Sequence, residues 1–389
     1  MAKKSKLKKE GSSTTRNPAA ELTYDLIVDI LSRLPASRSA DASAYPGGGA
    51  ASSPTPTTAR SSPKPSPASS TAARTNHAAP KLARHFVNVT GRGRPLICPT
   101  ISFLPRFDLE GMRMVDCCGG LLLFRCFMSS DEFCYLVCNP STEEWVAFPD
   151  SGYNPEWQFF THLGFDPAVS SHFHVFEFVM GDCGFVEGVE IYSSETGLWN
   201  FMESEWDPET TVYDRTRTFF NGMLHLVEEG IAILSVDVEG EIWQSIGAPR
   251  PELENVEDMF ALVSCFIGQS QGKLCYLSAY DTVPWNLSIW VLEDYSKDEW
   301  TLKHKLTTEQ LSEKINCKCK TDFDKAWYYH VVAVHSECNL IYYIAGGDTL
   351  MSYDMGHKQS CVIENLGPGN NSGYLPYVPL YSEILSHGC

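Results

Sequence analysis

The chain has 389 residues and a formal net charge of −18, of which residues 1–94 carry +10 and residues 95–389 carry −28. Phosphate contacts require a basic surface, so the acidic part argues against a nucleic-acid partner. We also expect no membrane partner and no secretion signal, because no apolar run approaches the length of a membrane span. The length suits a short module followed by one large domain.

Residues 1–20 form a basic segment that contains Lys3, Lys4, Lys6, Lys8 and Lys9. We expect a solvated, disordered tail. Lysine clusters also serve as nuclear-import signals, so the expected location is the nucleus, the cytoplasm or both. The 14 cysteines suit a reducing compartment, and their spacing offers no zinc-binding pairs.

Residues 21–35 predict one short amphipathic helix. Its apolar side chains recur at helical spacing and form one stripe, which consists of Leu26, Ile27, Ile30, Leu31 and Leu34. Thr23 is suited to cap the start of the helix, and Pro35 ends it. An isolated helix of this length is marginally stable in water, so the stripe needs a partner, either in this chain or in another protein.

This helix resembles the first half of an F-box. The residues that match its pattern are Leu22, Asp25, Leu26, Ile30, Leu31, Arg33, Leu34 and Pro35, whereas Thr23 stands where proline is usual. The resemblance implies a Skp-type adaptor as the partner of the helix. The adaptor-binding residues that it implies are Leu22, Leu26, Ile27, Ile30, Leu31, Leu34 and Pro35.

The resemblance stops at residue 36, and an Ala-, Ser-, Pro- and Thr-rich segment, residues 36–81, replaces the second half of the F-box. From Ala36 to Pro80 there is no Leu, Ile, Val, Phe or Trp, so little can be buried to offset chain entropy. We therefore expect a disordered linker and a weakened adaptor contact. The segment is either a natural linker or the product of a shifted reading frame, and the return of patterned sequence near residues 82–86 favours the second.

Residues 82–389 contain a repeating unit of apolar strands, a polar turn and a strand opened by tryptophan. The turns are predicted at residues 139–142, 194–197, 237–240 and 295–298, and the tryptophans are Trp145, Trp199, Trp243 and Trp300. These tryptophans lie 54, 44 and 57 residues apart, a spacing typical of propeller blades. We expect them to be structural residues between blades. A β-sandwich is the alternative, but it does not explain a tryptophan that recurs after a turn.

The pattern therefore predicts a mainly β fold, a kelch-like β-propeller. A fifth, weaker unit has Cys361 where tryptophan is expected, and the five units suggest a ring of about six blades. The last blade would combine residues 96–104 with residues 374–384. One helix, Thr307–Ile315, is expected as an insertion, because Thr307 can cap it and Leu311 and Ile315 share a face.

These units resemble the F-box-associated propeller of grass-type plant F-box proteins. The resemblance spans residues 84–385 and rests on the order of four segments, Phe103–Arg106, Gly111–Gly120, Asn139–Thr142 and Tyr377–Glu383. It implies the substrate-recognition subunit of a Skp/cullin/F-box ubiquitin ligase, whose propeller binds a target protein. The sequence does not identify that target.

Two alternatives stay open: a propeller scaffold that no longer joins the ligase, and a propeller-type oxidase or glycosidase. We predict no catalytic residue, no cofactor and no metal site. Residues Gly268–Gly272 match the Gly-x-Ser-x-Gly nucleophile motif, but strands predicted on both sides indicate a hairpin and not the strand-to-helix elbow. The histidines show no spacing typical of metal ligands.

Overall fold

The computed structural model divides into two compact units, Met1–Pro65 and Ser66–Cys389. The structure describes residues 69–72, 85–88, 103–104, 111–128, 132–153, 160–181, 183–212, 216–228, 232–249, 262–280, 286–295, 297–307, 310–311, 329–346, 348–366, 374–382 and 384–385. The predicted tail and the predicted adaptor helix, residues 21–35, lie outside the described residues.

Five antiparallel sheets of four strands account for most of the described residues of the second unit, and we number them as blades in chain order. Blade 1 contains β3 (Gly111–Cys118), β4 (Leu121–Phe127), β5 (Phe133–Asn139) and β6 (Glu144–Pro149). Blade 2 contains β7 (Thr161–Gly164), β8 (His174–Met180), β9 (Val186–Ser193) and β10 (Leu198–Glu203). Blade 3 contains β11 (Arg217–Phe220), β12 (Met223–Glu228), β13 (Ala232–Asp237) and β14 (Trp243–Gly247).

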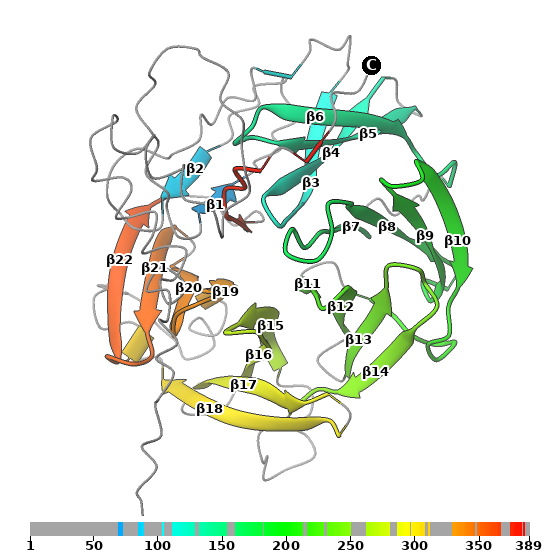
Figure 1. The fold of residues 1–389 in the computed structure, drawn as a ribbon. Coiled ribbons are helices and arrows are strands. Elements are labelled where there is room, and N and C mark those ends of the chain that lie inside the picture. Colours follow the sequence, from blue (N-terminus) through cyan, green and yellow to red (C-terminus); the bar gives the residue numbers. More distant parts are fainter. Residues whose placement is uncertain are drawn as a thin grey trace, which may run out of the picture. The chain divides into compact units, whose positions relative to one another are not determined.

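Blade 4 contains β15 (Leu262–Ser270), β16 (Lys273–Tyr280), β17 (Asn286–Asp294) and β18 (Glu299–Thr307). Blade 5 contains β19 (Tyr329–Val334), β20 (Leu340–Ala345), β21 (Thr349–Asp354) and β22 (Gln359–Asn365). In every blade the strands pair in chain order, and the first strand is the innermost one (Figure 1). The first strands contact one another, β3 with β7, β11 with β15 and β15 with β19. This arrangement is a β-propeller, as the sequence predicts.

The hydrophobic core lies between the blades. One cluster of buried side chains combines Leu121 and Tyr135 of blade 1 with Val175 and Tyr192 of blade 2. Similar clusters join blade 2 to blade 3, blade 3 to blade 4 and blade 4 to blade 5. The second strand β4 is buried along nearly its whole length, whereas the outermost strand β10 is largely exposed. Each sheet therefore depends on its neighbours for burial of its faces.

The polar turn before each outermost strand recurs as predicted. In four blades the fourth residue after the end of the third strand has a positive φ, at Glu143, Gly197, Asp298 and Lys358. The first residue often fixes the turn through its side chain. Asn139 Oδ1 accepts from the backbone N–H of Ser141 at 3.0 Å, and Asp354 Oδ1 accepts from Gly356 at 2.8 Å. Short polar side chains favour this backbone conformation, which explains why the turns are visible in the sequence.

The hairpin between β3 and β4 requires glycine. Gly119 and Gly120 have φ values of +55° and +90°. A Cβ atom on Gly119 would lie 2.7 Å from the Phe165 ring, and one on Gly120 would lie 2.5 Å from Cβ of Leu380. The glycine pair therefore allows both blade 2 and the C-terminal segment to approach blade 1 closely.

The prediction of about six blades is wrong for the described residues, which form five blades and one smaller sheet. That sheet has three strands, β2 (His85–Asn88), β1 (Ser69–Ala72) and β23 (Tyr374–Tyr377), in this order. Strand β23 contacts both β19 of blade 5 and β3 of blade 1. Strand β23 therefore occupies the predicted closing position, and its described partner is β1 (Ser69–Ala72). Of the predicted partner segment, residues 96–104, only residues 103–104 are described, and they are not in a strand.

Strand β1 lies inside the segment predicted to be disordered, so for residues 69–72 that prediction is wrong. Its sequence, Ser-Ser-Thr-Ala, has no large apolar side chain. Pairing with β2 on one side and β23 on the other uses backbone groups, which every residue other than proline supplies in full. Apolar patterning therefore could not reveal this strand. The rest of the predicted linker lies outside the described residues.

Of the expected helix Thr307–Ile315, Thr307 is the last residue of β18, residues 310–311 are helical, and the other residues lie outside the described ones. The backbone N–H of Thr307 donates to the side-chain oxygen of Gln310 at 2.9 Å, a capping interaction at the predicted start. Leu311 is buried, and its carbonyl accepts from the Tyr343 hydroxyl at 2.7 Å. This contact fixes the helix start against blade 5.

We predict that β1 stabilises the closed ring. A chain that starts at residue 66 keeps β1, whereas one that starts at residue 81 leaves the edges of β2 and β23 unpaired. Since several backbone hydrogen bonds are lost at about 1 kcal/mol each, the shorter chain should melt on the order of 5 °C or more below the longer one. Thermal unfolding followed by circular dichroism measures this difference. Equal melting temperatures would show that β1 has no part in closure.

The four blade tryptophans lie on the outermost strands, at or next to the first residue, and all are half-buried. Trp199 Nε1 donates to the carbonyl of Pro149, the last residue of the preceding blade's outermost strand, at 3.0 Å. Trp300 repeats this contact with Gly247 at 3.1 Å. Trp243 donates to Gly240 of its own turn at 2.8 Å, and Trp145 packs in the cluster shared with the closing sheet. Two tryptophans therefore link successive blades directly.

We predict that Trp199→Ala lowers the free energy of unfolding by about 2–3 kcal/mol, less than the cost for a fully buried aromatic residue. The ring packs against Tyr135, Phe148 and Tyr192, so packing accounts for most of the loss. Trp199→Phe keeps a ring and should cost only about 1 kcal/mol. Leu198→Ala, at an exposed position of the same strand, is the control and should change stability by less than about 0.5 kcal/mol. Urea unfolding distinguishes these values, and a Trp199→Ala effect as small as that of the control would contradict the linking role.

Candidate functional site

A hollow of about 450 Å³ opens at one edge of blade 1, and we call it the rim hollow. The β4–β5 hairpin and the end of β6 form its walls. The lining residues are Met128, Glu132, Phe133, Cys134, Ala147, Phe148, Pro149 and Asp150. Loops at the rim of a rigid scaffold are common binding positions, so the rim hollow is the candidate site.

Local sequence explains the shape of the walls. The backbone N–H of Met128 donates to the carbonyl of Glu132 at 2.9 Å, which closes the β4–β5 hairpin. Pro149 ends β6, where its missing N–H is tolerated because β6 is an edge strand. The Met128 side chain is 48% exposed, whereas Phe133 and Phe148 are buried beneath the surface. The rim hollow therefore has an apolar floor and a partly exposed apolar wall.

Stacked aromatic rings form the floor and join two blades. Phe148 of β6 stacks on Tyr192 of β9, with ring centroids 4.0 Å apart and an interplanar angle of 9°. Tyr135 packs on Phe148 at 5.6 Å and meets Phe133 edge-on at 5.3 Å. Such contacts add to the free energy of burial and restrict ring orientation. The floor is therefore held by both blade 1 and blade 2.

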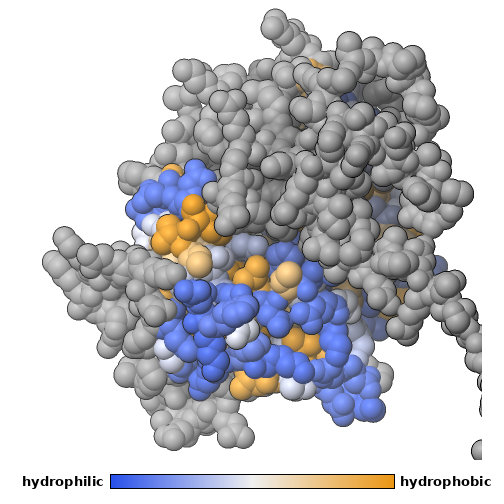
Figure 2. All heavy atoms as spheres, turned by 60° about the vertical axis from the view of Figure 1, so that its left-hand side comes forward, coloured by the Kyte–Doolittle hydropathy of each residue, from blue (hydrophilic) through white to orange (hydrophobic). Residues whose placement is uncertain are grey.

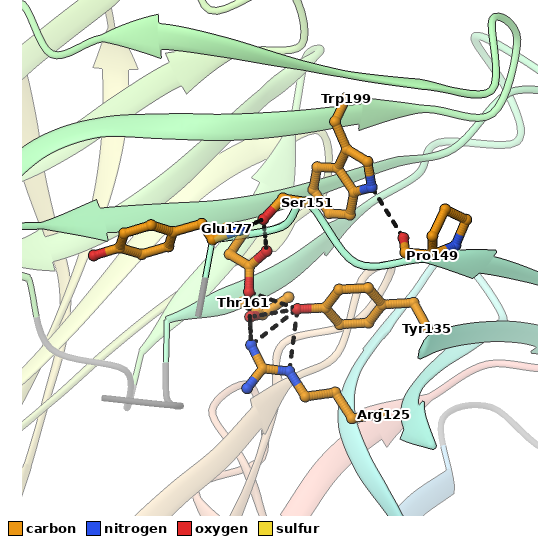
Figure 3. Close-up of polar contacts among 8 residues, drawn as sticks. Arg125, Tyr135, Pro149, Ser151, Thr161, Glu177 and Trp199 are labelled. Carbon is orange, nitrogen blue, oxygen red and sulfur yellow. Dashed lines mark hydrogen bonds and ion pairs between the residues drawn. The ribbon is translucent and has the colours of Figure 1, made fainter. Parts of the chain in front are cut away.

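A buried ion pair contacts the hydroxyl of Tyr135, one of the rings of this floor (Figure 3). Arg125 of β4 and Glu177 of β8 are 2% and 1% exposed, and Nη2 of Arg125 lies 2.9 Å from Oε1 of Glu177. The Tyr135 hydroxyl donates to the same carboxylate oxygen at 2.8 Å, and Ser151 Oγ donates to the other at 2.7 Å. Arg125 also donates to Thr161 Oγ1 at 2.6 Å. These contacts satisfy a charge pair that would otherwise be costly to bury.

Burial shifts the acid–base behaviour of the groups around the floor. Burial raises the pKa of Glu177 above its usual value, although the hydrogen bond from Ser151 and the Arg125 charge oppose the shift. Burial also raises the pKa of the Tyr135 hydroxyl and of the Cys134 thiol. A thiol with a raised pKa is a poor nucleophile at neutral pH. Cys134 therefore serves as an apolar lining residue.

A second polar cluster joins the innermost strands. Asp116 of β3 accepts from Arg217 of β11, with Nη2 at 2.7 Å and Nε at 3.1 Å. It also accepts from the backbone N–H of Leu163 in β7 at 2.8 Å. Burial lowers the pKa of the adjacent His162, which is fully buried and stays neutral. One carboxylate thus ties together the first strands of blades 1, 2 and 3.

None of the four predicted tryptophans lines the rim hollow. Leu22, Leu26, Ile27, Ile30, Leu31, Leu34 and Pro35 lie outside the described residues. Of the four tryptophans, Trp199 lies nearest to the candidate site, because it contacts Phe148 and Pro149. Sequence reasoning missed the ion pair, although one sign of it is present. Arg125 and Glu177 are each the single charged residue of an otherwise apolar strand. A charge in such a position is usually paired.

The Gly-x-Ser-x-Gly motif lies in a hairpin, as predicted. Ser270 ends β15, Gln271 and Gly272 form a turn with φ values of +52° and +71°, and β16 begins at Lys273. Ser270 Oγ donates to the backbone carbonyl of His335 at 2.8 Å, so its hydroxyl has a structural contact. Within the described ranges no group of three or more His, Cys, Asp or Glu side chains is arranged to hold a metal ion. None of the helical residues in the described part forms a helix that is long and apolar enough to cross a membrane.

The side of the unit that carries β21 and β22 presents a different surface. Figure 2 turns this side toward the viewer and shows mainly hydrophilic residues, with small apolar areas between them. Val362 of β22 is 51% exposed, and Glu364 of the same strand is exposed as well. Scattered exposed apolar residues are normal on soluble surfaces, so this side supplies control positions and no candidate site.

Comparison with known proteins identifies the class of the fold. Residues 101–347 match the F-box associated beta propeller domain family, and the chain belongs to this family. It is 24% identical to F-box protein At5g07610 of Arabidopsis thaliana over 225 residues, which are 54% of this chain and 52% of that protein. It is 27% identical to F-box protein At5g49610 of the same plant over 214 residues, which are 50% of this chain and 56% of that protein. The chain thus spans about half the length of the curated relatives it matches.

Solved structures resemble the chain only distantly. The structure described as YCF48 bound to D1 peptide has a TM-score of 0.37 and 11% identity, and the match covers 67% of this chain and 69% of that one. The alpha-L-arabinofuranosidase Arb93A from Fusarium graminearum, in complex with an iminosugar inhibitor, has a TM-score of 0.34 and 10% identity, with 69% and 80% covered. Similarity at this level supports no statement about function.

We predict that the buried ion pair matters for stability only as a pair. Arg125→Met alone should lower the free energy of unfolding by about 3–5 kcal/mol, because it leaves the Glu177 carboxylate buried without its cation. The double variant Arg125→Met/Glu177→Met should lose much less than the sum of the single changes. Urea unfolding of the four chains in the cycle measures the coupling, and additive losses would contradict it.

The pH dependence of Arg125→Met provides a second measurement. Without the cation, the folded-state pKa of Glu177 rises further above its unfolded value. A carboxyl group with a raised folded-state pKa contributes stability below the unfolded pKa and loses it as the pH rises through the folded pKa. Relative to wild type, Arg125→Met should therefore recover stability between pH 7.5 and about pH 5. A constant difference across this range would show that the carboxylate is not the group left unpaired.

Proposed function

We propose that the chain is the substrate-recognition subunit of a Skp/cullin/F-box ubiquitin ligase. The observation that carries this proposal is the match of residues 101–347 to the F-box associated propeller family, downstream of a segment, residues 22–35, whose sequence resembles the first half of an F-box. The helix would bind a Skp-type adaptor, and the propeller would hold a target protein. We also propose that the chain acts in the nucleus or the cytoplasm. Within its family, we propose that it is most similar to the F-box proteins of grasses.

The proposed contribution of the chain to ubiquitin transfer is proximity. A target held on the propeller has its lysines at a high effective concentration near the charged enzyme. This role needs a binding surface and no reactive group in the chain. We propose no enzymatic activity, since the one nucleophile motif forms a hairpin and the matched relatives are F-box proteins.

A second candidate is a propeller scaffold that does not join the ligase. The sequence favours it at one point, because residues 36–65 have none of the apolar and basic pattern of a second F-box half. A complete F-box buries more than one helix against the adaptor. At about 25 cal/mol per Å² of apolar surface, the loss of several hundred Å² removes several kcal/mol of binding free energy.

We predict that the unmodified chain binds a purified Skp-type adaptor weakly, with a dissociation constant in the micromolar range or above. Ile30→Asp combined with Leu34→Asp should abolish the remaining binding, because both changes place charges on the apolar stripe. Asp29→Asn, off the stripe, is the control and should bind as the unmodified chain does. Isothermal titration or a quantitative pull-down measures all three.

Restoring the missing half should restore tight binding. Replacement of residues 36–65 by a second F-box half keeps β1, so the propeller is unaffected. The chimaera should bind the adaptor at least about a hundredfold more tightly. Nanomolar binding by the unmodified chain would show that the first helix suffices, whereas no binding by the chimaera would favour the scaffold.

A further inference from the structure

We propose that the surface of blade 1 that contacts the C-terminal segment is a binding site for an extended peptide segment of the target protein. The C-terminal segment comprises the described residues 380–382 and 384–385, and it occupies this surface in the structure (Figure 1). We call the surface the segment-binding surface, and its polar residues are Asn139 and Glu144. The target segment displaces the C-terminal segment, which therefore acts as an autoinhibitory contact. This inference rests on the proposed target-binding role of the propeller.

The polar residues of the segment-binding surface bind the backbone of the C-terminal segment. Asn139 Nδ2 donates to the carbonyl of Leu380 at 3.0 Å and to that of Ser382 at 3.3 Å. Glu144 Oε2 accepts from the backbone N–H of Ile384 at 3.1 Å. Backbone carbonyl and N–H groups are common to all peptides. These three hydrogen bonds therefore suit an extended segment of another protein as well as the segment that is bound.

Asn139 and Glu144 are held in position by their own turn. Asn139 Oδ1 accepts from the backbone N–H of Ser141 at 3.0 Å, and Glu144 Oε2 also accepts from Thr142 Oγ1 at 2.8 Å. Beneath the C-terminal segment, Asn139 is 0% exposed and Glu144 is 8% exposed. A side chain that is already held in place loses little conformational freedom when a ligand binds. The segment-binding surface is therefore preorganised for an extended peptide.

Apolar side chains of the C-terminal segment give the contact its specificity. Leu385 is 5% exposed and belongs to the core cluster shared by blades 1 and 2, and Leu380 and Ile384 pack against the same cluster. Gly120 leaves room for Leu380, since a Cβ atom on this glycine would lie 2.5 Å from Cβ of Leu380. The proposed occupant is therefore a segment with a leucine followed four and five residues later by aliphatic residues.

The C-terminal segment is bound by the contacts described above and not by strand pairing. Strand β23 ends at Tyr377, and none of the described residues after it belongs to a strand. Tyr377 is buried, and its hydroxyl lies 3.1 Å from Ser141 Oγ, so β23 has anchors of its own. Val378, at 50% exposed, and Tyr381, at 39% exposed, lie on the outer side. The C-terminal segment can therefore leave while the closing strand stays in place.

The covalent link to β23 determines how strongly the C-terminal segment competes with a target. Short linkers give effective concentrations on the order of millimolar. A target segment of equal intrinsic affinity therefore binds much more weakly to the intact chain than to a chain whose own segment has been released. A target that also contacts other parts of the propeller overcomes this competition, whereas a short unrelated segment does not.

The test releases the C-terminal segment from a chain that is already folded. A thrombin recognition sequence is inserted after Val378 of the full chain, and part of the purified protein is cleaved and dialysed. The probe is the fluorescein-labelled peptide Val-Pro-Leu-Tyr-Ser-Glu-Ile-Leu-Ser, the sequence of residues 378–386. Fluorescence anisotropy measures its binding. We expect the cleaved chain to bind the probe at least about tenfold more tightly than the uncleaved chain.

A control peptide tests the apolar contacts. It has the sequence Val-Pro-Leu-Tyr-Ser-Glu-Asp-Asp-Ser, in which aspartates replace the two aliphatic residues that pack on the core cluster. Because a charge cannot be buried there without a partner, this peptide should bind the cleaved chain at least about tenfold more weakly than the probe does.

Variants of the cleavable chain locate the contact. Glu144→Ala removes the acceptor for the N–H of Ile384 and should weaken binding of the probe to the cleaved chain at least about tenfold. Glu143→Asn is a control in the same turn, because it removes an exposed carboxylate and asparagine tolerates the positive φ. Glu364→Ala, on the side shown in Figure 2, is a distant control. Both controls should leave the affinity unchanged, and thermal melting checks that each variant is folded.

Equal affinities of the cleaved and uncleaved chains, or equal affinities for the probe and the control peptide, would overturn the proposal. Unfolding of the cleaved chain as its C-terminal segment dissociates would show that this segment is part of the fold, and would overturn the proposal as well. An unchanged affinity in a folded Glu144→Ala variant would place the contact elsewhere, with the same consequence. Should Glu144→Ala fail to fold, the comparison of the two peptides still decides.

The adaptor titration separates this inference from the ligase proposal, because it reports on residues 22–35 alone. A chain that binds the probe but no adaptor would keep the segment-binding surface as a binding site of a scaffold. A chain that binds the adaptor but whose cleaved form does not take up the probe would keep the ligase role and overturn the inference.

Discussion

The structure depends on one constraint: a four-stranded sheet with two apolar faces cannot bury both of them by itself. Most core clusters of the propeller therefore combine residues of two neighbouring sheets, as Tyr135 and Tyr192 do between blades 1 and 2. Polar contacts follow the same geometry. The Arg125–Glu177 pair and the carboxylate of Asp116 both join strands of different blades. Such buried polar contacts stabilise little in net terms, but they fix which strands meet.

The sequence predicted those parts of the fold that depend on side-chain pattern. Each recurring turn favours a short polar residue at its start and a residue with positive φ near its end. Asn139 is an example of the first and Gly197 of the second, so the turns can be recognised in the sequence. The tryptophans on the outermost strands of blades 1 to 4 are visible because they recur after the turns. Two of the innermost strands, β7 and β11, have only four residues each, which is too short for a clear alternating pattern. Strand β1 was predicted to be disordered, because its pairing depends on backbone groups and leaves no apolar signal.

The candidate site could not be predicted from the sequence, because its residues come from distant parts of the chain. Phe148 and Tyr192 lie far apart in the chain, and only the order of strands within two blades brings their rings to 4.0 Å. The same holds for Arg125 and Glu177, which are separated by 52 residues. Each charge is conspicuous within its own apolar strand, yet neither identifies its partner. Which side chains meet between two blades depends on how the blades are arranged around the propeller. No local pattern of a single sequence shows this arrangement.

The two proposed contacts use separate parts of the chain, residues 22–35 for the adaptor and the segment-binding surface of blade 1 for the target. Proximity requires both at once, since either contact alone raises no effective concentration of target near the ligase. The ring-closing strand β1 belongs to the propeller, although it lies close in sequence to the segment that follows the adaptor helix. It fixes the start of the propeller at residues 69–72, upstream of the matched family region. A change in residues 36–65 therefore alters the adaptor contact and leaves the segment-binding surface intact, whereas loss of residues 69–72 weakens the ring that holds this surface.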